Sequence, residues 1–191
     1  MWVRRPDPVS LLNASIFFDF RPLFGAAHLA KQLRNYLLGL TRGNPLFLRM
    51  MAANSLSVAP PLGIIRDFVT DADPKHPGSI DLKKFGARLF VDAARLFALA
   101  NGVIHTNSVQ RLRNACEYMG MSTEQMAAAI DGFSFIQLLR LRHQHLEDEA
   151  GRDSDNLVYP DQLNELDRRI LKEAFRQARK LQQRLKLDYQ I

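Results

Sequence analysis

Cysteine is almost missing from this sequence, which contains only Cys116. A lone cysteine cannot form an intrachain disulfide, which suits a reducing cytosol. Long apolar runs are missing as well, since no stretch reaches the roughly 18 consecutive apolar residues of a membrane-spanning helix. The first residues lead through Arg4-Arg5 into Pro6 and Pro8 instead of into the apolar centre of a signal peptide. These absences predict a cytoplasmic protein without a membrane partner.

The motifs of a self-sufficient enzyme are also missing. No serine or cysteine stands in a recognisable nucleophile motif with a histidine, and no glycine-rich loop could cradle a phosphate. Asp71-Ala72-Asp73 has a spacing that on a strand sends both carboxylates to one side, where they could hold a divalent metal. It lies before Pro74 in a breaker-rich segment, so we interpret it as a solvated turn. His143 and His145 are two residues apart and point to different sides of a helix, which disfavours a shared metal.

The composition is that of a folded domain. With 191 residues, of which 47% are hydrophobic and 24% charged, the chain can bury one full core. The net charge of +6 and the pI of about 9.8 permit an acidic or phosphate-bearing partner without defining one. Basic runs with interleaved aromatic residues are absent, which argues against a nucleic-acid partner.

The N-terminal part combines one predicted strand with predicted helices. Residues 15–20 are rich in aromatic and β-branched side chains and are closed by Arg21-Pro22, so they predict a short strand. Apolar residues at helical spacing predict a helix over about 25–40 and a second one over about 45–55. The proline-rich and glycine-rich segment 58–80 is a long excursion with a candidate short strand at 64–69, and loops of this length are usually functional or mobile.

The remainder is regular and helical. Its predicted helices have apolar stripes and capping signals, and they run over about 81 or 86–101, 107–120, 122–149 and 164–185. Ser122 with Gln125 is the clearest start signal, a capping box, and Asp131-Gly132 is a candidate break in the helix that follows. Long amphipathic helices joined by short loops predict an all-α fold, an antiparallel helical bundle of the four-helix up-and-down type with extra helices, preceded by the short β-containing segment.

Two polar stripes lie on these predicted helices. Arg88, Asp92 and Arg95 are at positions i, i+4 and i+7, where two cations around one carboxylate could hold a phosphate or an acidic side chain. The alternative is a solvated face with ion pairs worth about a few tenths of a kcal/mol each. Arg140 and Gln144 also share a face and could bind a carbonyl or phosphate oxygen, the alternative being polar contacts between helices.

Seven short motifs follow one another in order along nearly the whole chain. They are Phe18-Asp19-Phe20-Arg21-Pro22-Leu23-Phe24-Gly25, Pro60-Pro61-Leu62-Gly63, Asp81-Leu82-Lys83, Val91-Asp92-Ala93-Ala94-Arg95-Leu96, Leu139-Arg140-Leu141-Arg142-His143-Gln144, Asp155-Asn156 and Leu171-Lys172-Glu173-Ala174-Phe175. The series resembles the C-terminal substrate-binding domain of bacterial nucleotidyltransferases that are often fused to CBS domains, in the polymerase-β-like superfamily. Each motif is short, so the specificity of the resemblance lies in their order.

The resemblance implies a helical domain like the bundle that follows the catalytic domain in kanamycin nucleotidyltransferase and in glutamine synthetase adenylyltransferase. The implied reaction moves a nucleotidyl group from a nucleoside triphosphate, with Mg²⁺, to a protein or small-molecule acceptor. Such enzymes carry a Gly-Ser element followed by a paired-aspartate strand and a third carboxylate, because two divalent cations bridge the triphosphate. Here Gly78-Ser79 comes after Asp71-Ala72-Asp73, the wrong order. The resemblance therefore implies a domain that is not catalytic alone, and an upstream catalytic domain as its partner.

Asp19 takes its predicted role from the same resemblance. Phe18-Asp19-Phe20-Arg21-Pro22 is similar to the Asp-Leu-Arg strand by which adenylyltransferases supply the third carboxylate, so Asp19 would be a catalytic metal ligand only if the upstream domain is present. The alternative is an acidic residue on an edge strand, bonded to Arg21 or to solvent. The residues implied to face the acceptor or the nucleotide are Arg21, Arg88, Asp92, Arg95, Arg140, Gln144 and Asn156.

The resemblance also implies a division of the chain. Residues 1–24 would be the link to, or the remnant of, the catalytic domain, and residues 25–191 the helical substrate-binding domain. A different hypothesis remains, in which the chain is a helical protein-interaction or regulatory module whose basic face docks an acidic partner.

Overall fold

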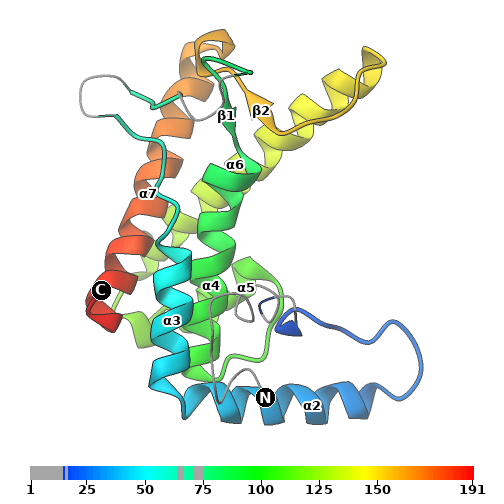
Figure 1. Ribbon diagram of the computed structural model, residues 1–191, viewed down its shortest axis with the longest axis vertical. Coiled ribbons are helices and arrows are strands. Elements are labelled where there is room, and N and C mark those ends of the chain that lie inside the picture. The colour runs from blue at the N-terminus through cyan, green and yellow to red at the C-terminus, as the bar shows by residue number, and fades with distance from the viewer. Residues whose placement is uncertain (1–14, 16, 64–66, 71–74) are drawn as a thin grey trace. The chain divides into compact units, whose positions relative to one another are not determined.

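The computed structural model describes residues 15, 17–63, 67–70 and 75–191 (Figure 1). The helices are α2 (Ala27–Arg42), α3 (Pro45–Ser55), α4 (Arg88–Asn101), α5 (Ser108–Ala115), α6 (Thr123–Glu149) and α7 (Glu165–Tyr189). The sheet of the described part is a single ribbon of β1 (Ile80–Asp81) and β2 (Leu157–Val158), which pair antiparallel. The predicted all-α fold is confirmed, and the helix packing is compatible with a bundle. Asp71-Ala72-Asp73 lies outside the described residues.

Side-chain caps start the helices where the sequence predicts. Ser122 Oγ accepts from the Gln125 amide at 3.2 Å and Gln125 Oε1 accepts from the Ser122 amide at 3.0 Å, so the predicted capping box is complete. Asn107 Oδ1 accepts from the backbone amide three residues on, at 3.1 Å, at the start of α5. Asn164 does the same for Asp167 at 2.8 Å before α7. These bonds satisfy amides that the first turn of a helix leaves without partners.

The strand predicted over residues 15–20 is wrong. Ser15 and Phe17 are helical, and Phe18-Asp19 forms a turn. A lone strand has no neighbour for its backbone groups, whereas here the Phe18 amide donates to the Ser15 carbonyl at 3.4 Å. The Phe18 side chain is only 4% exposed and its ring lies 5.9 Å from that of Phe47. Phe18 therefore serves a core contact and not a pleated sheet, whereas Phe17 is 59% exposed.

Two further expectations are changed by tertiary contacts. The candidate break at Asp131-Gly132 does not form, and α6 continues through it. A Cβ at Gly132 would lie 3.1 Å from the Cα of Ala174, so glycine is there to let α6 and α7 approach closely. Of the segment predicted as a strand at 64–69, residues 64–66 lie outside the described part, and Phe68 forms only an isolated bridge with Leu62.

The chain forms two compact units, with one boundary after α3 and the others within α4, α6 and α7. Unit 1 contains the described residues of Met1–Ser57, Val91–Met126 and Arg184–Ile191, and unit 2 contains those of Val58–Phe90 and Ala127–Gln183. The core of unit 2 includes an edge contact between Phe68 and Phe175 and a contact between Phe90 and Phe133. The described residues on both sides of the predicted domain boundary between residues 24 and 25 belong to unit 1. The division into two domains at this point stays a prediction.

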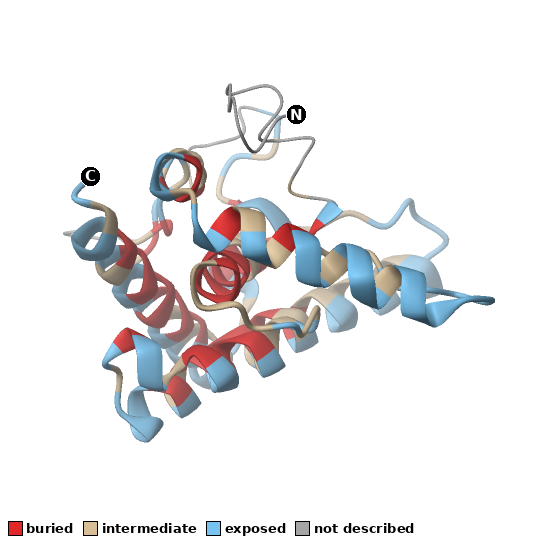
Figure 2. Cartoon of the chain, turned by 90° about the horizontal axis from the view of Figure 1, so that it is seen from below, coloured by how far each residue is buried: buried red, intermediate tan, exposed pale blue. Residues whose placement is uncertain are grey.

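Helix α2 of unit 1 has an uncovered apolar stripe. Leu29, Leu33 and Tyr36, at helical spacing, are all at least half exposed, and Leu37 is the buried leucine of this helix. Figure 2 shows α2 exposed over most of its length. In the part of the chain that the structure describes, no helix combines the length and the apolar character needed to cross a membrane.

Candidate functional site

The first polar cluster, in unit 1, is centred on Asp19 and consists of Asp19, Asp92, Arg95 and Arg111. Arg95 of α4 donates from Nη2 to Asp19 Oδ2 at 2.6 Å, and Arg111 of α5 places Nη1 2.5 Å from Asp19 Oδ1. Arg95 also donates from Nη1 to Asp92 Oδ1 at 2.9 Å, one turn earlier in α4. The Asp19 cluster thus joins three segments that are far apart in the sequence.

Arg111 is the most buried member of the Asp19 cluster, with 2% of the residue exposed. Its Nε donates to the His105 carbonyl at 2.7 Å and its Nη2 donates to the Phe18 carbonyl at 2.9 Å. A buried guanidinium is tolerated because its donors find acceptors. Sequence reasoning did not identify Arg111. The one available signal is its position next to Leu112, on the buried face of α5.

The electrostatic environment of Asp19 is positive. Burial alone would raise the pKa of the Asp19 carboxyl, but the hydrogen bond and charge of Arg95 and the charge of Arg111 outweigh it, so the pKa lies below its usual value. Burial lowers the pKa of Arg111, and the charge of Asp19 opposes that change. Arg34 of α2 adds a third cation, with its guanidinium 4.6 Å from the centre of the Phe20 ring and Nη2 donating to the Phe20 carbonyl.

This geometry does not fit a divalent cation at Asp19. Both carboxylate oxygens of Asp19 are paired with guanidinium groups. Three arginines also stand around two aspartates, and this excess of positive charge repels a divalent cation. Among the residues that the structure describes, no three His, Cys, Asp or Glu side chains gather where they could hold a metal ion. The catalytic and metal roles of Asp19 stay a prediction for a complete enzyme, and we derive no step through a metal in this chain.

The second polar cluster, in unit 2, is centred on Asn156 and consists of Gln137, Arg140, Gln144 and Asn156. Arg140 donates from Nε and Nη2 to Asn156 Oδ1 at 3.0 and 2.8 Å, and from Nη1 to Gln137 Oε1 at 2.6 Å. Gln144 Nε2 donates to the same Asn156 oxygen at 3.4 Å. The Asn156 carbonyl accepts from the Leu82 amide at 2.9 Å. The Asn156 cluster therefore holds the segment before β2 against α6 and next to the end of β1.

The neighbouring residue Asp155 extends this arrangement. Asp155 Oδ1 lies 2.7 Å from His143 Nε2 and accepts from the Leu157 amide at 2.9 Å. His143 lies about one helical turn after Arg140 and directly before Gln144 on α6, and all three side chains reach the same short segment. The Leu139 to Gln144 and Asp155-Asn156 motifs are thus two sides of one contact. These hydrogen bonds hold the loop before β2 in position on α6. They are structural polar contacts, the kind of role that the alternative for Arg140 and Gln144 describes, although here they join a helix to a loop.

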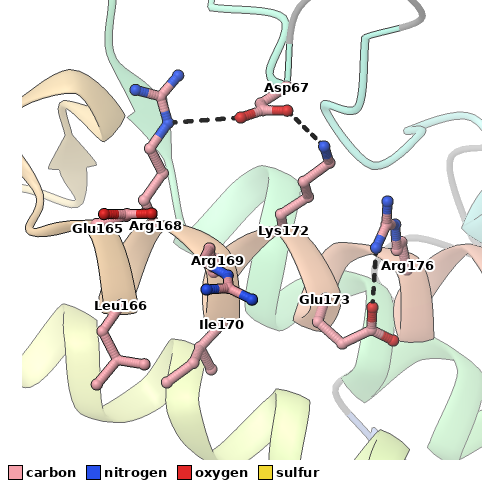
Figure 3. A pocket seen from close by; sticks show the side chains of 9 residues that line it. All are labelled: Asp67, Glu165, Leu166, Arg168, Arg169, Ile170, Lys172, Glu173 and Arg176. Carbon is pink, nitrogen blue, oxygen red and sulfur yellow. Dashed lines mark hydrogen bonds and ion pairs between the residues drawn. The ribbon is translucent and has the colours of Figure 1, made fainter.

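A shallow groove of about 940 Å³ runs along α7 in unit 2 (Figure 3). Its lining residues combine four cations, three carboxylates and two apolar side chains, namely Asp67, Glu165, Leu166, Arg168, Arg169, Ile170, Lys172, Glu173 and Arg176. Asp67 lies between Arg168 and Lys172, and ion pairs with both lower the pKa of its carboxyl, the hydrogen bond from Lys172 most strongly. Arg179 donates to the Leu62 carbonyl at 3.2 Å, so both Leu62 and Asp67 are attached to α7.

The structure divides the sequence-predicted site residues between the two units. Arg95 pairs with both Asp19 and Asp92 in unit 1, whereas Arg140, Gln144 and Asn156 meet in unit 2. Arg88 is half-buried at the start of α4 in unit 2, and Arg21 is exposed. Sequence reasoning did not identify Arg111, Asp67 and Lys172 as site residues. Arg111 binds Phe18, 93 residues away, and Lys172 binds Asp67, 105 residues away, so neither contact leaves a local signal in the sequence.

Comparison with known proteins identifies the family. No curated protein and no solved structure matches the chain. The model of one family, described as "Putative nucleotidyltransferase substrate binding domain", matches residues 45–189, about three quarters of the sequence. The match begins at the first residue of α3 and includes both arginines of the Asp19 cluster and all of the Asn156 cluster. The chain therefore belongs to the family of nucleotidyltransferase substrate-binding domains.

Proposed function

We propose that this chain binds the acceptor, a protein or a small molecule, for a reaction in which a separate catalytic domain transfers a nucleotidyl group from a nucleoside triphosphate. The observation that carries this proposal is the family match over residues 45–189. The order of Gly78-Ser79 and Asp71-Ala72-Asp73 supports a division of labour, because the two-cation chemistry of such a transfer needs a Gly-Ser element ahead of its paired aspartates. Mg²⁺ and the triphosphate would bind in the complete enzyme.

The groove on α7 is our candidate for the acceptor site. Its volume of about 940 Å³ is in the range of small-molecule sites. Charged side chains of both signs stand beside the exposed Leu166 and Ile170, so an acceptor with a charged group and an apolar part would find complementary contacts. Arg169 and Arg176 are exposed at its surface, Arg176 in an ion pair with Glu173 at 3.2 Å, and both are suited to meet an acidic group.

A transfer assay with two arms tests the proposed function. The chain alone, given nucleoside triphosphate and Mg²⁺, should release no pyrophosphate. A catalytic domain that carries the Gly-Ser and Asp-x-Asp elements should label an acceptor from α-³²P nucleoside triphosphate only when this chain is present. Pyrophosphate released at an enzymatic rate by the chain alone would refute the proposal, and so would acceptor labelling that is equal with and without the chain.

The predicted catalytic role of Asp19 has its own test in the complete enzyme. As a third metal-binding carboxylate, Asp19 would have to leave Arg95 and Arg111, and Asp19→Asn would then abolish transfer while the protein stays folded. If Asp19→Asn retains transfer activity, Asp19 is not a catalytic carboxylate. The substrate-binding proposal would be unaffected by that result, because it rests on residues 45–189.

A second candidate function is favoured by the exposed stripe on α2. Its Leu29, Leu33 and Tyr36 are accompanied by cations only, since α2 contains no acidic residue. Two copies of this helix would bring like charges together, so the stripe fits an acidic partner protein with apolar anchors better than a second copy. A helical peptide with leucines at i, i+4 and i+7 and flanking glutamates is a suitable probe. The peptide should no longer bind to the double variant Leu29→Glu/Leu33→Glu. Equal binding to the double variant and the unmodified chain would refute the proposed docking function of α2.

A further inference from the structure

The guanidinium of Arg95 is held by an incomplete set of acceptors. Nε and Nη2 lie on the same edge of the planar group, and their N–H bonds point to the same side. Nη2 donates to Asp19 Oδ2 at 2.6 Å. Nε is buried and has no hydrogen-bond partner among the residues that the structure describes. Arg95 is only 8% exposed, so water does not readily replace the missing acceptor.

As Asp19 is placed, it does not complete this set, since neither of its oxygens is bonded to Arg95 Nε. Its Oδ1 lies 2.5 Å from Arg111 Nη1 and its Oδ2 accepts from Arg95 Nη2, which leaves Arg95 Nε over. A phosphate ion or a phosphate monoester carries at least three terminal oxygens in a tetrahedral arrangement. It could meet Nε and Nη2 of Arg95 with two of them, as arginine forks commonly do, and Arg111 Nη1 with a third.

We infer that Arg95 and Arg111 form a binding site for a phosphate group, and that Asp19 of the same chain occupies this site in its absence. The site is built, since both arginines are more than nine-tenths buried and their remaining donors are fixed by Asp92, His105 and Phe18. With Arg34 close by, the cations outnumber the carboxylates, which favours an anion of higher charge than a carboxylate.

Asp19 is in a position to leave the site. Its side chain is 35% exposed, in contrast to the two arginines. Beyond Phe20, which Arg34 contacts, the chain is open, since Leu23 is 91% exposed and Phe24 is fully exposed. Phe18 is the residue that anchors the segment in the core. Rotation of the Asp19 side chain towards solvent would therefore open the site while the Phe18 anchor stays in place.

Calorimetric titration of the whole chain with inorganic phosphate tests this inference. Asp19→Ala should bind phosphate at least about 10-fold more tightly than the unmodified chain, in which the open site is only a small fraction of the population. Phosphate should also raise the thermal midpoint of Asp19→Ala more than that of the unmodified chain, at matched ionic strength. Asp19→Asn keeps the shape of the side chain and should show a smaller gain in affinity, which provides a second variant if Asp19→Ala does not fold.

The matched control is Asp19→Ala/Arg95→Lys, which keeps the positive charge but removes the Nε and Nη2 fork. We expect it to lose most of the gain in phosphate affinity. Equal phosphate affinity in Asp19→Ala and the unmodified chain would overturn the inference, and an unaltered gain in the double variant would do the same. A gain from acetate as large as that from phosphate would overturn the assignment to phosphate. These measurements need no transfer activity, so their outcome is independent of the proposed function.

Discussion

The two polar clusters of this protein use arginine in opposite ways. In the Asp19 cluster, Arg95 and Arg111 hold a charged carboxylate that comes from 76 and 92 residues earlier in the chain, and one buried donor is left over. In the Asn156 cluster, Arg140 directs its three nitrogen groups at neutral amide oxygens from Gln137 and Asn156, the more distant of them 16 residues away. The first arrangement depends on ionisation and long-range folding, whereas the second depends on local hydrogen bonds.

The largest expected effect is that of removing Arg111. Arg111→Ala leaves Asp19 without one partner and removes the donors to the carbonyls of Phe18 and His105. We expect a loss of about 3 to 5 kcal/mol in the free energy of unfolding, as for broken buried ion pairs. Urea denaturation measures it, with the exposed Arg113→Ala on the same helix as the control, for which the change should stay within about 0.5 kcal/mol. Similar losses for both variants would contradict the buried role of Arg111.

Asp19→Asn should have a smaller effect that depends on pH. The pKa of Asp19 is lowered in the folded protein, so its stabilisation is present above the ordinary pKa and is lost as the pH falls through the lower, folded value. At pH 7 we expect a loss of about 2 to 3 kcal/mol, less than for a fully buried pair because the side chain is 35% exposed. The difference from the unmodified chain should begin to shrink as the pH falls below about 4 and vanish only below the folded pKa of Asp19. A difference that is constant from pH 7 to pH 3 would show that the charge of Asp19 is unimportant.

Asn156→Ala should destabilise the protein without that pH dependence. It leaves two half-buried nitrogens of Arg140 without their acceptor, and we expect a loss of about 1 to 3 kcal/mol. The exposed Asn114→Ala serves as the control, with a much smaller change. Thermal unfolding at pH 7 and at pH 3 would check both points. A loss that differs strongly between these pH values would mean that the two clusters are not distinguished by charge.

The smallest effect on the free energy of unfolding is expected for the exposed stripe of α2, because its side chains are not buried in the isolated chain. Leu33→Gln should change the free energy of unfolding by less than about 0.5 kcal/mol. Leu37→Ala, four residues further on the same helix, removes a buried side chain and should cost about 2 kcal/mol or more. Denaturation of both variants tests whether the stripe is free. A large loss for Leu33→Gln would show that Leu33 is part of the core.

The helices were predictable because their signals are local. Capping side chains such as Ser122, Asn107 and Asn164 bind amides three residues away, a spacing that can be read from the sequence. The failed strand over residues 15–20 had a strong local pattern, but its outcome depended on the core contact between Phe18 and Phe47. Gly132 also resembles a helix break until Ala174 is placed next to it.

The sequence by itself determined the helical class, the helix starts and the family, because periodicity, capping and motif order are properties of neighbouring residues. It also placed Asp92 with Arg95 and Arg140 with Gln144 on common helix faces. Only the tertiary structure decided that Asp19 lies between Arg95 and Arg111, and that Arg111 is buried. Such pairings depend on how segments far apart in the chain pack together, and a guanidinium has the same local sequence signal whether it meets water, a carboxylate or a ligand.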